Sequence, residues 1–295
     1  MTRVLATFCN QDCARLAVVD PSGVIHCQTL PSGRIPANVR GISGGAVQGD
    51  KFIAALQCAT PALVVCSRDL EPELVIPMPC CDDLHGLAPV RDAVLVISTG
   101  TNEVYRVEVA AEPRISLFWS ETDDRGDTVH LNDIAVGPEG IVFSAFGRRR
   151  ANQMRCGQVF KVHPREVILE GLREPHSPQW SKGDLFVLES GSGDLVRLTP
   201  GAHPERLFTI RGYTRGLLVS QTHFVVGVSG YRRRSRNVGL GGGRTRPFDP
   251  LTPLAEDVSG LVFLPRTAQG RVAPEGASFV DTSNIGPEIY AVVPW

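Results

Sequence analysis

The chain has 295 residues, of which 42% are hydrophobic and 21% charged, and its formal net charge is −1. This composition is typical of a globular protein, and the near-zero charge excludes bulk attraction to nucleic acid or to an acidic membrane. No segment approaches the ~20 apolar residues that span a bilayer, and the N-terminal segment lacks a secretory leader pattern. We therefore expect a cytoplasmic protein with no membrane or nucleic-acid partner.

Short apolar runs follow one another along the whole chain. They begin with RVLATFC (3–9), ARLAVVD (14–20) and VIHCQTLP (24–31), continue through runs such as KFIAALQ (51–57), AVLVIST (93–99), IVFSAF (141–146), DLFVLES (184–190) and HFVVGVS (223–229), and end with EIYAVVPW (288–295). Turn residues separate the runs, and no amphipathic helix interrupts them. This pattern predicts an all-β protein.

The strands recur in groups. In five groups, a turn comes before the second strand, and we take the residue seven positions before the last residue of that turn. These residues are Ser43, His85, Asp133, His176 and Arg215, at separations of 42, 48, 43 and 39 residues. A period of ~40–50 residues with four strands per unit indicates a β-propeller.

The two ends of the chain complete the count of blades. The first three strands lack an inner partner, which the last strand can supply, so that the ring closes without an open sheet edge. We predict a six-bladed propeller forming a single domain over residues 1–295, with a loop at 230–257 inserted in the last blade. The expected blades are 1–31 with 288–295, 40–79, 85–120, 130–172, 176–210 and 215–282.

Ionisable side chains stand where the inner strands begin. The inner strands line the central channel, so these residues are predicted to surround its mouth and to form a catalytic site. The set comprises His85, His130, Asp133, His176, Arg215 and Glu288. Two kinds of chemistry remain open. His85, His130 and His176 could bind a divalent metal such as Zn, Mn or Fe. Alternatively, one histidine could remove a proton from the substrate while a second histidine or Glu288 donates one.

Further residues are expected to bind the substrate. They are Arg215 as an anion clamp, with Asn132, Ser43, Tyr231, Arg232 and Trp180 around it. Arginines also crowd the loop FGRRRANQMRCG (146–157) and the loop at 230–257. If both loops cover the channel, its mouth is basic and favours a small anionic substrate. The loop PCCDDLHG (79–86) carries Cys80 and Cys81, which we expect not to face one point.

The segment EPHSPQW (174–180) places a histidine between two prolines. Proline lacks a backbone N–H and is tolerated at the start of a strand. We expect Pro175 and Pro178 to aim His176 into the channel, and Trp180 to pack between blades.

Several of these motifs resemble an uncharacterised bacterial family of propeller-like proteins. They are HLNDIAV (130–136), PHSPQW (175–180), RGLLV (215–219) and PEIYAVV (287–293). That resemblance implies a fold but no reaction. NDIAVGPEG (132–140) is more distantly similar to the gluconolactonase/regucalcin group, which implies a calcium site formed by Glu288, Asn132 and Asp133.

The hypothesis we favour is an enzyme that acts on a small anionic metabolite by hydrolysis, elimination, cyclisation or isomerisation. The alternatives are a non-catalytic binding or scaffold propeller and a calcium-dependent lactonase-like hydrolase. We expect no nucleotide cofactor, because the GLGGG run (239–243) lacks a strand-to-helix context. A monomer or weak homo-oligomer is expected.

Overall fold

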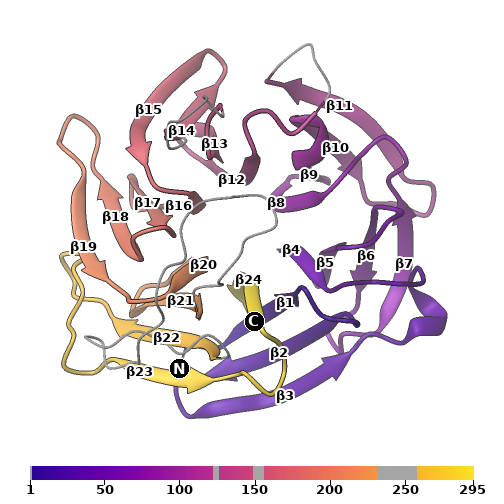
Figure 1. Ribbon diagram of the computed structural model, residues 1–295, viewed down its shortest axis with the longest axis horizontal. Coiled ribbons are helices and arrows are strands. Elements are labelled where there is room, and N and C mark those ends of the chain that lie inside the picture. The colour runs from indigo at the N-terminus through magenta and orange to yellow at the C-terminus, as the bar shows by residue number, and fades with distance from the viewer. Residues whose placement is uncertain (1, 122–125, 149–155, 231–257) are drawn as a thin grey trace.

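The computed structural model describes residues 2–121, 126–148, 156–230 and 258–295. Tyr231, Arg232 and most of the predicted inserted loop lie outside these residues. In the described part, 24 strands form six four-stranded antiparallel sheets arranged as the blades of a propeller around a central channel (Figure 1). The predicted fold class and blade count are confirmed. No helix in the described ranges is long and apolar enough to span a membrane.

The blades follow the chain in order, apart from the strand that closes the ring. Blade 1 contains β24 (Glu288–Pro294), β1 (Val4–Cys9), β2 (Arg15–Asp20) and β3 (Gly23–Thr29). Blade 2 contains β4 (Ile42–Gln48), β5 (Lys51–Leu56), β6 (Ala62–Cys66) and β7 (Pro72–Pro77). Blade 3 contains β8 (Leu84–Val90), β9 (Ala93–Ser98), β10 (Glu103–Glu108) and β11 (Arg114–Ser120).

The second half of the ring repeats this pattern. Blade 4 contains β12 (Leu131–Gly137), β13 (Gly140–Ala145), β14 (Gly157–Val162) and β15 (Arg165–Leu172). Blade 5 contains β16 (Pro175–Ser181), β17 (Asp184–Glu189), β18 (Asp194–Leu198) and β19 (Glu205–Thr209). Blade 6 contains β20 (Tyr213–Val219), β21 (His223–Ser229), β22 (Ser259–Pro265) and β23 (Ser278–Asp281). Short 3-10 turns, η1 (Ser32–Arg34) and η2 (Thr99–Thr101), complete the elements.

Ring closure by the C-terminal strand is confirmed. β24 pairs antiparallel with β1, from Val4 opposite Pro294 to Cys9 opposite Glu288. In Figure 1 this strand lies beside β1 at the centre of the ring, between β20 and β4. The strand therefore satisfies the inner edge of the N-terminal blade, and it delivers the last residues of the chain to the channel wall.

The hydrophobic core is divided among the junctions between blades. Each of six clusters draws residues from neighbouring blades, as Leu5 and Phe52 show for blades 1 and 2. Burial decreases outward, because β1 is buried along its whole length whereas β3 is largely exposed. At four junctions within the described residues a hydroxyl also donates to the next inner strand or to the segment just before it. These bonds run from Ser43 to Leu84, Thr99 to Leu131, Ser190 to Thr214 and Ser259 to Gly286. Apolar contact and these bonds hold the inner strands in register around the channel.

Candidate functional site

The inner strands β4, β8, β12, β16, β20 and β24 all begin at the same end of the channel. We call this end the upper mouth and define it by the side chains of Cys9, Asp83, His85, His130, Asn132, His176, Tyr213, Arg215, Glu288 and Tyr290. The opposite end, where the inner strands finish, is the lower mouth. The three predicted histidines do gather at the upper mouth. The ring centroids of His85 and His130 are 5.6 Å apart, and the Tyr290 ring lies 5.1 Å from His85 and 6.4 Å from His176.

A β-bulge interrupts each inner ladder near its start. Register shifts follow Ile42, Leu84, Leu131, His176 and Arg215 on five inner strands, and a sixth separates Ala6 from Phe8 opposite β24. A bulge takes residues out of the regular alternation and re-aims their side chains, and bulges are frequent beside functional sites. The residues within these six interruptions include Ser43, His85, Asn132, Ser177, Gly216 and Tyr290. Three of them form the network described next.

His85 lies at the centre of a buried hydrogen-bond network. Its Nδ1 is 3.0 Å from Asn132 Oδ1 and 2.6 Å from the Tyr290 hydroxyl, while its Nε2 is 3.4 Å from Asp83 Oδ2. The Asn132 amide nitrogen donates to the Pro175 carbonyl, which orients its oxygen toward His85. The Tyr290 hydroxyl also donates to that oxygen, at 3.0 Å. Both nitrogens of His85 therefore face acceptors, which favours the imidazolium.

Electrostatics supports a charged His85. Burial by itself lowers the pKa of this histidine, but the charge and hydrogen bond of Asp83 outweigh burial and raise it. Burial likewise raises the pKa of Asp83, and the attraction of His85 reverses this and lowers it to about 2. The Tyr290 hydroxyl keeps its proton, because burial holds its pKa well above the usual range. The result is an ion pair between a buried imidazolium and a partly exposed carboxylate, in contact with a neutral phenol.

His130 occupies the position beside this network. Its Nδ1 lies 2.8 Å from Asp127 Oδ2, and its ring packs against Phe146 with a centroid distance of 4.5 Å. The backbone of His130 has a φ of 51°, in the left-handed region that is uncommon for residues other than glycine, although histidine adopts it more often than most. Asp127 and this left-handed backbone orient the ring toward His85.

His176 has a different environment. Its Nδ1 lies 3.0 Å from the Glu174 carbonyl and 2.7 Å from Ser190 Oγ. Since the Ser190 hydroxyl gives its hydrogen to the Thr214 carbonyl, both neighbours of Nδ1 are acceptors, and the proton resides on Nδ1. Nε2 then carries a lone pair, and this buried atom has no hydrogen-bond partner among the described residues. Burial, aided by the charge of Arg215, lowers the pKa of His176 well below its usual value, so the ring is a neutral base.

Arg215 supplies the cation of the upper mouth. Its Nη1 is 3.3 Å from Glu288 Oε2, and its guanidinium carbon stacks 4.7 Å from the Tyr213 ring and 5.2 Å from the Tyr290 ring. Its buried Nε finds no hydrogen-bond acceptor in the described residues. The guanidinium is therefore held in place, with one donor left for an anionic group.

Asp133 is not part of the histidine cluster, contrary to its predicted catalytic role. Its Oδ2 accepts hydrogen bonds from the backbone N–H and the hydroxyl of Ser177, both at 3.0 Å, and its Oδ1 accepts one from the Ile134 N–H. The Ser177 hydroxyl in turn accepts from the Gly216 N–H. Burial raises the pKa of Asp133. This carboxyl joins β12, β16 and β20 below the upper mouth.

Trp180 and Ser43 also lie away from the predicted substrate site. Trp180 follows His176 by four residues, about 13 Å along an extended strand, and lines a lower-mouth cavity of about 290 Å³ together with Asp133 and Ser177. Its indole packs on Gly137 of the neighbouring blade, where an added Cβ would lie 2.4 Å from the ring. The predicted packing between blades is thus confirmed. Ser43 is buried and donates to the Leu84 carbonyl, so it ties blade 2 to blade 3.

The predicted metal sites do not fit this geometry. Within the described residues, no group of three or more His, Cys, Asp or Glu side chains is placed to hold a metal ion. Both nitrogens of His85 face protein partners, so in this arrangement that ring has no nitrogen left for a metal ion. The calcium set implied by the distant resemblance fails as well, because the oxygens of Asn132 and Asp133 are already bonded to different protein groups. In the described residues the three histidines are thus not arranged as a metal site, and Asn132 and Asp133 are engaged by protein groups.

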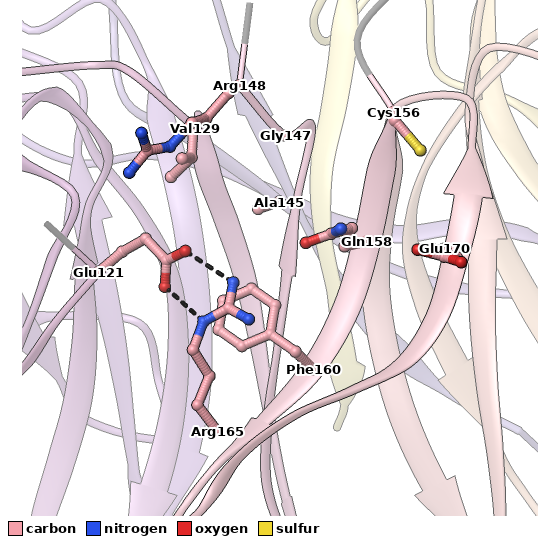
Figure 2. A pocket seen from close by; sticks show the side chains of 10 residues that line it. All are labelled: Glu121, Val129, Ala145, Gly147, Arg148, Cys156, Gln158, Phe160, Arg165 and Glu170. Atoms are coloured by element: carbon pink, nitrogen blue, oxygen red, sulfur yellow. Dashed lines mark hydrogen bonds and ion pairs between the residues drawn. The ribbon is translucent and has the colours of Figure 1, made fainter.

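A separate polar cavity of about 330 Å³ lies where blades 3 and 4 meet (Figure 2). Glu121 and Arg165 form a bidentate ion pair at 2.7 and 3.0 Å on one side of it, and the Arg165 guanidinium lies 4.5 Å from the Phe160 ring. Gln158 and Glu170 project from β14 and β15 on the other side. Since Glu121 follows β11 and Arg165 begins β15, the ion pair joins two blades. None of the predicted site residues that the structure describes lines this cavity.

Sequence reasoning overlooked four residues of the upper mouth. Tyr290 stands two residues after Glu288 on the same strand, which a period-two reading of β24 could have identified. Asp83 lies in the loop PCCDDLHG (79–86), but its contact with His85 depends on the bulge in β8. Cys9 is the last residue of β1 and Tyr213 is the first residue of β20. Nothing in their local sequence distinguishes them from packing residues.

Comparisons with known proteins bear on the fold. A family model described as a domain of unknown function (DUF4915) matches residues 83–241, more than half of the chain. No curated protein matches significantly. A protein of unknown function from Bacteroides caccae is similar over 100% of this chain and 99% of its own, at a TM-score of 0.60 and 11% identity.

Two further structural matches illustrate how broadly this fold is used. A chain of the nidogen/laminin complex matches 99% of this chain and 97% of its own, at a TM-score of 0.65 and 9% identity. Streptogramin B lyase matches 95% of this chain and 88% of its own, at a TM-score of 0.53 and 9% identity. At such low identity the likeness concerns the fold alone.

Proposed function

Since the chain belongs to the DUF4915 family, whose description assigns no function, we propose a function from the geometry of the upper mouth. This propeller is an enzyme that removes a proton from a small anionic metabolite and returns one to it, in an elimination or an isomerisation. His176 is the base, Tyr290 is the proton donor supported by His85, and Arg215 binds the anionic group. The observation that carries the proposal is the unpartnered Nε2 of a neutral, fully oriented His176.

The base is ready to act without rearrangement. Glu174 and Ser190 hold the His176 proton on Nδ1, so the lone pair of Nε2 is directed to the other side of the ring. A general base needs its correct protonation state near neutral pH and a position within hydrogen-bond reach of the substrate proton. Leaving a buried polar atom unpaired costs roughly 1–3 kcal/mol in stability. A substrate that brings a proton to Nε2 would explain why the fold keeps this atom unpaired.

The acid consists of Tyr290 and its support. The His85 imidazolium donates to the Tyr290 oxygen at 2.6 Å, which favours transfer of the phenolic proton from its contact with Asn132 Oδ1 to a substrate oxygen as that oxygen becomes negative. The Asp83 carboxylate stabilises the His85 imidazolium. His85 can therefore give a proton to the Tyr290 oxygen after the phenol has lost its own. Arg215 stacks on the same phenol and stabilises the negative charge that develops nearby.

The anionic character of the substrate rests on Arg215. Glu288 contacts one of its nitrogens, while Nε lacks an acceptor in the described residues. The substrate carboxylate binds at Arg215 Nε, and the carbon next to that carboxylate then faces His176. A C–H bond on this carbon is acidic because it lies beside a carboxyl or carbonyl group, so a histidine can remove its proton. The fold accommodates a lyase in streptogramin B lyase, which is compatible with an elimination here.

Proton exchange with solvent tests this function without knowledge of the natural product. The protein is incubated in D₂O with a panel of small hydroxy acids, oxo acids and amino acids, and ¹H NMR follows deuterium incorporation or loss of a leaving group. We expect at least one carboxylate to exchange a C–H proton, and His176→Gln to abolish that exchange. Exchange that survives in His176→Gln would refute the assignment of the base.

The protonation state of His176 is tested separately from any substrate. ¹⁵N NMR of histidine-labelled protein distinguishes the two neutral tautomers from the imidazolium. We expect one histidine to remain in the Nδ1–H form at pH 6 and its resonances to disappear in His176→Gln. A His176 resonance that titrates near pH 6.5 would contradict the proposal at its central point.

A further inference from the structure

Cys9 lies at the upper mouth in a fixed position that the acid–base proposal does not use. It is the last residue of β1, pairs with Glu288 across the closure of the ring, and is 1% exposed. Gly41 packs directly on its backbone, where an added Cβ would lie 2.5 Å from the Cys9 Cα. The position of the sulfur is therefore determined by two neighbouring strands and not by a mobile loop.

Three polar groups surround the sulfur. Asn10 Nδ2 lies 3.1 Å from Sγ, Arg215 Nη1 lies 4.0 Å from it, and the thiol donates to Glu288 Oε2 at 3.8 Å. N–H donors and a nearby guanidinium favour a thiolate, and a carboxylate in contact can accept the thiol proton. Cys9 thus has a base, a cation and an amide donor around one nucleophilic atom.

Asn10 is held in place for this contact. Its backbone has a φ of 59° and donates its N–H to Gln57 Oε1 at 3.0 Å, while Gln57 Nε2 donates to its side-chain oxygen at 3.3 Å. These bonds orient the amide so that Nδ2 faces both Cys9 and Glu288. Gln57, in blade 2, therefore positions a donor beside a sulfur in blade 1.

Two atoms outside this cluster indicate that a ligand enters here. The same guanidinium that contacts Cys9 leaves its Nε without an acceptor, and His176, 1% exposed, leaves Nε2 without a donor, both within the described residues. Tyr290 lies between them, with its ring near both side chains. A small molecule bound to Arg215 Nε contacts the guanidinium whose Nη1 lies 4.0 Å from the Cys9 sulfur.

We propose that Cys9 is an activated nucleophile that adds reversibly to the carbonyl carbon of a small oxo acid bound at the upper mouth. The Sγ–C bond forms as the C=O π bond opens, the thiol proton passes to Glu288, and the electron pair moves to the carbonyl oxygen. Arg215 stabilises that oxyanion, and Glu288 returns the proton to it, which gives a hemithioacetal without any net oxidation or reduction. This step does not depend on proton abstraction by His176.

Alkylation kinetics test the nucleophile in the intact protein. Iodoacetamide is applied at pH 6.5, and peptide mass spectrometry follows each cysteine separately. We expect Cys9 to react about tenfold faster than Cys156, an exposed thiol outside the cluster, because the thiolate is the reacting species. A Cys9 that reacts no faster than Cys156 overturns the proposal.

Variants of the surrounding groups separate activation from accessibility. Asn10→Ala is expected to slow alkylation of Cys9 severalfold at pH 6.5, because it removes the N–H donor that lies 3.1 Å from the sulfur. Asn38→Ala, at an exposed asparagine with a similar φ of 58°, is the matched control and should leave the rate unchanged. Equal rates in Asn10→Ala and the wild type would show that the amide does not activate the sulfur, and would refute the proposed cluster.

A protection experiment tests the class of ligand. Glyoxylate, the smallest molecule with an aldehyde and a carboxylate, is expected to slow alkylation of Cys9 and to leave Cys156 unaffected, whereas acetate should have no effect. Protection by acetate to the same extent would show anion binding without addition to the carbonyl, which contradicts the covalent step. His176→Gln should retain fast alkylation, so failure of the acid–base function and failure of this proposal are distinguishable.

Discussion

The hydroxyl of Tyr290 lies 2.6 Å from Nδ1 of His85, although 205 residues separate them in the chain. Closure of the ring makes this contact possible, because β24 enters blade 1 beside the inner strands of the other blades. The last strand therefore has two consequences. It completes the N-terminal sheet, and it brings a phenol and Glu288 to the upper mouth.

Replacing Tyr290 with phenylalanine removes the hydroxyl and retains the ring. We expect Tyr290→Phe to lower turnover by roughly 10²–10⁴-fold if the phenol is the proton donor, and to lower the free energy of unfolding by only about 1 kcal/mol. Tyr105→Phe is the matched control, since Tyr105 donates to Glu103 in blade 3, away from the upper mouth. Urea denaturation and NMR turnover assays measure the two effects, and equal loss of activity in both variants would argue against a specific role for Tyr290.

His176 is expected to tolerate substitution structurally but not functionally. His176→Gln should lower proton exchange by at least roughly 10²-fold, the usual contribution of a general base. His223→Gln, at a partly exposed histidine that begins β21 at the lower mouth, is expected to retain full exchange. Far-UV circular dichroism should show the same strand content in both variants.

The Asp83–His85 pair predicts a pH dependence of stability. The pKa of His85 is higher in the folded chain than in the unfolded chain, so its contribution is complete at acidic pH and is lost as pH rises through the folded value. The pKa of Asp83 is lowered to about 2, so its contribution is present above the unfolded value near 4 and is lost as pH falls toward 2. Together they stabilise the fold most in the interval between the unfolded pKa values of the two residues.

Asp83→Asn tests that dependence. We expect the variant to lose more stability at pH 5.5 than at pH 9, because His85 no longer gains from its protonation. Urea midpoints at several pH values measure this difference. His176 has the opposite sign: its lowered folded pKa means that stability falls as pH decreases below about 6.5. A loss in Asp83→Asn that is independent of pH would rule out the ion pair.

Arg215 and Arg266 provide a matched pair for testing the anion site. Each guanidinium stacks on two aromatic rings, Arg215 on Tyr213 and Tyr290 and Arg266 on Phe186 and Phe224. Arg266 follows β22 at the lower mouth. We expect Arg215→Lys to weaken binding of glyoxylate by roughly tenfold, since lysine cannot reproduce the planar fork, and Arg266→Lys to leave binding unchanged. Isothermal titration calorimetry measures the dissociation constant of glyoxylate for both variants, and an equal change in the two would contradict a specific role for Arg215.

Asp133 is predicted to affect stability and not activity. Asp133→Asn replaces a carboxylate oxygen that accepts two bonds from Ser177, and should lower the free energy of unfolding by about 1–3 kcal/mol. Proton exchange by the folded variant should remain at the wild-type rate. A specific loss of exchange with unchanged stability would return Asp133 to the site from which the structure removes it.

Much of the architecture could be predicted from local patterns. Turn-bounded apolar runs and a period of ~40–50 residues led to six blades, and the lone strand at 288–295 led to closure of the ring. The histidines at 85, 130 and 176 could be placed at one mouth because the repeat puts them at equivalent positions. The roles of Asp133 and Trp180 could not be predicted. An inner strand has two ends, and the position of a residue along the strand does not reveal which mouth its side chain faces.

The adjacent cysteines show the same limit at closer range. Adjacent cysteines do not easily face one point, yet the sulfur atoms of Cys80 and Cys81 are 3.8 Å apart. In an extended strand, neighbouring side chains face opposite sides, but these two residues lie in the turn before β8, where the alternation does not apply. Local sequence could identify the loop, but not the backbone angles within it.

The amino-acid sequence by itself determined the number of blades, the closing strand and the set of polar residues that begin the inner strands, because these depend on the spacing of strands and turns. Only the tertiary structure decided what those residues do. The bulges re-aim His85, Asn132 and Tyr290 into one network, while Asp133 turns to Ser177 and becomes a tie between blades. The proton of His176 is placed by Ser190 and Thr214, and the sulfur of Cys9 meets Arg215 across the closure. Such contacts join residues far apart in the chain, so they depend on distances and angles that no repeat length specifies.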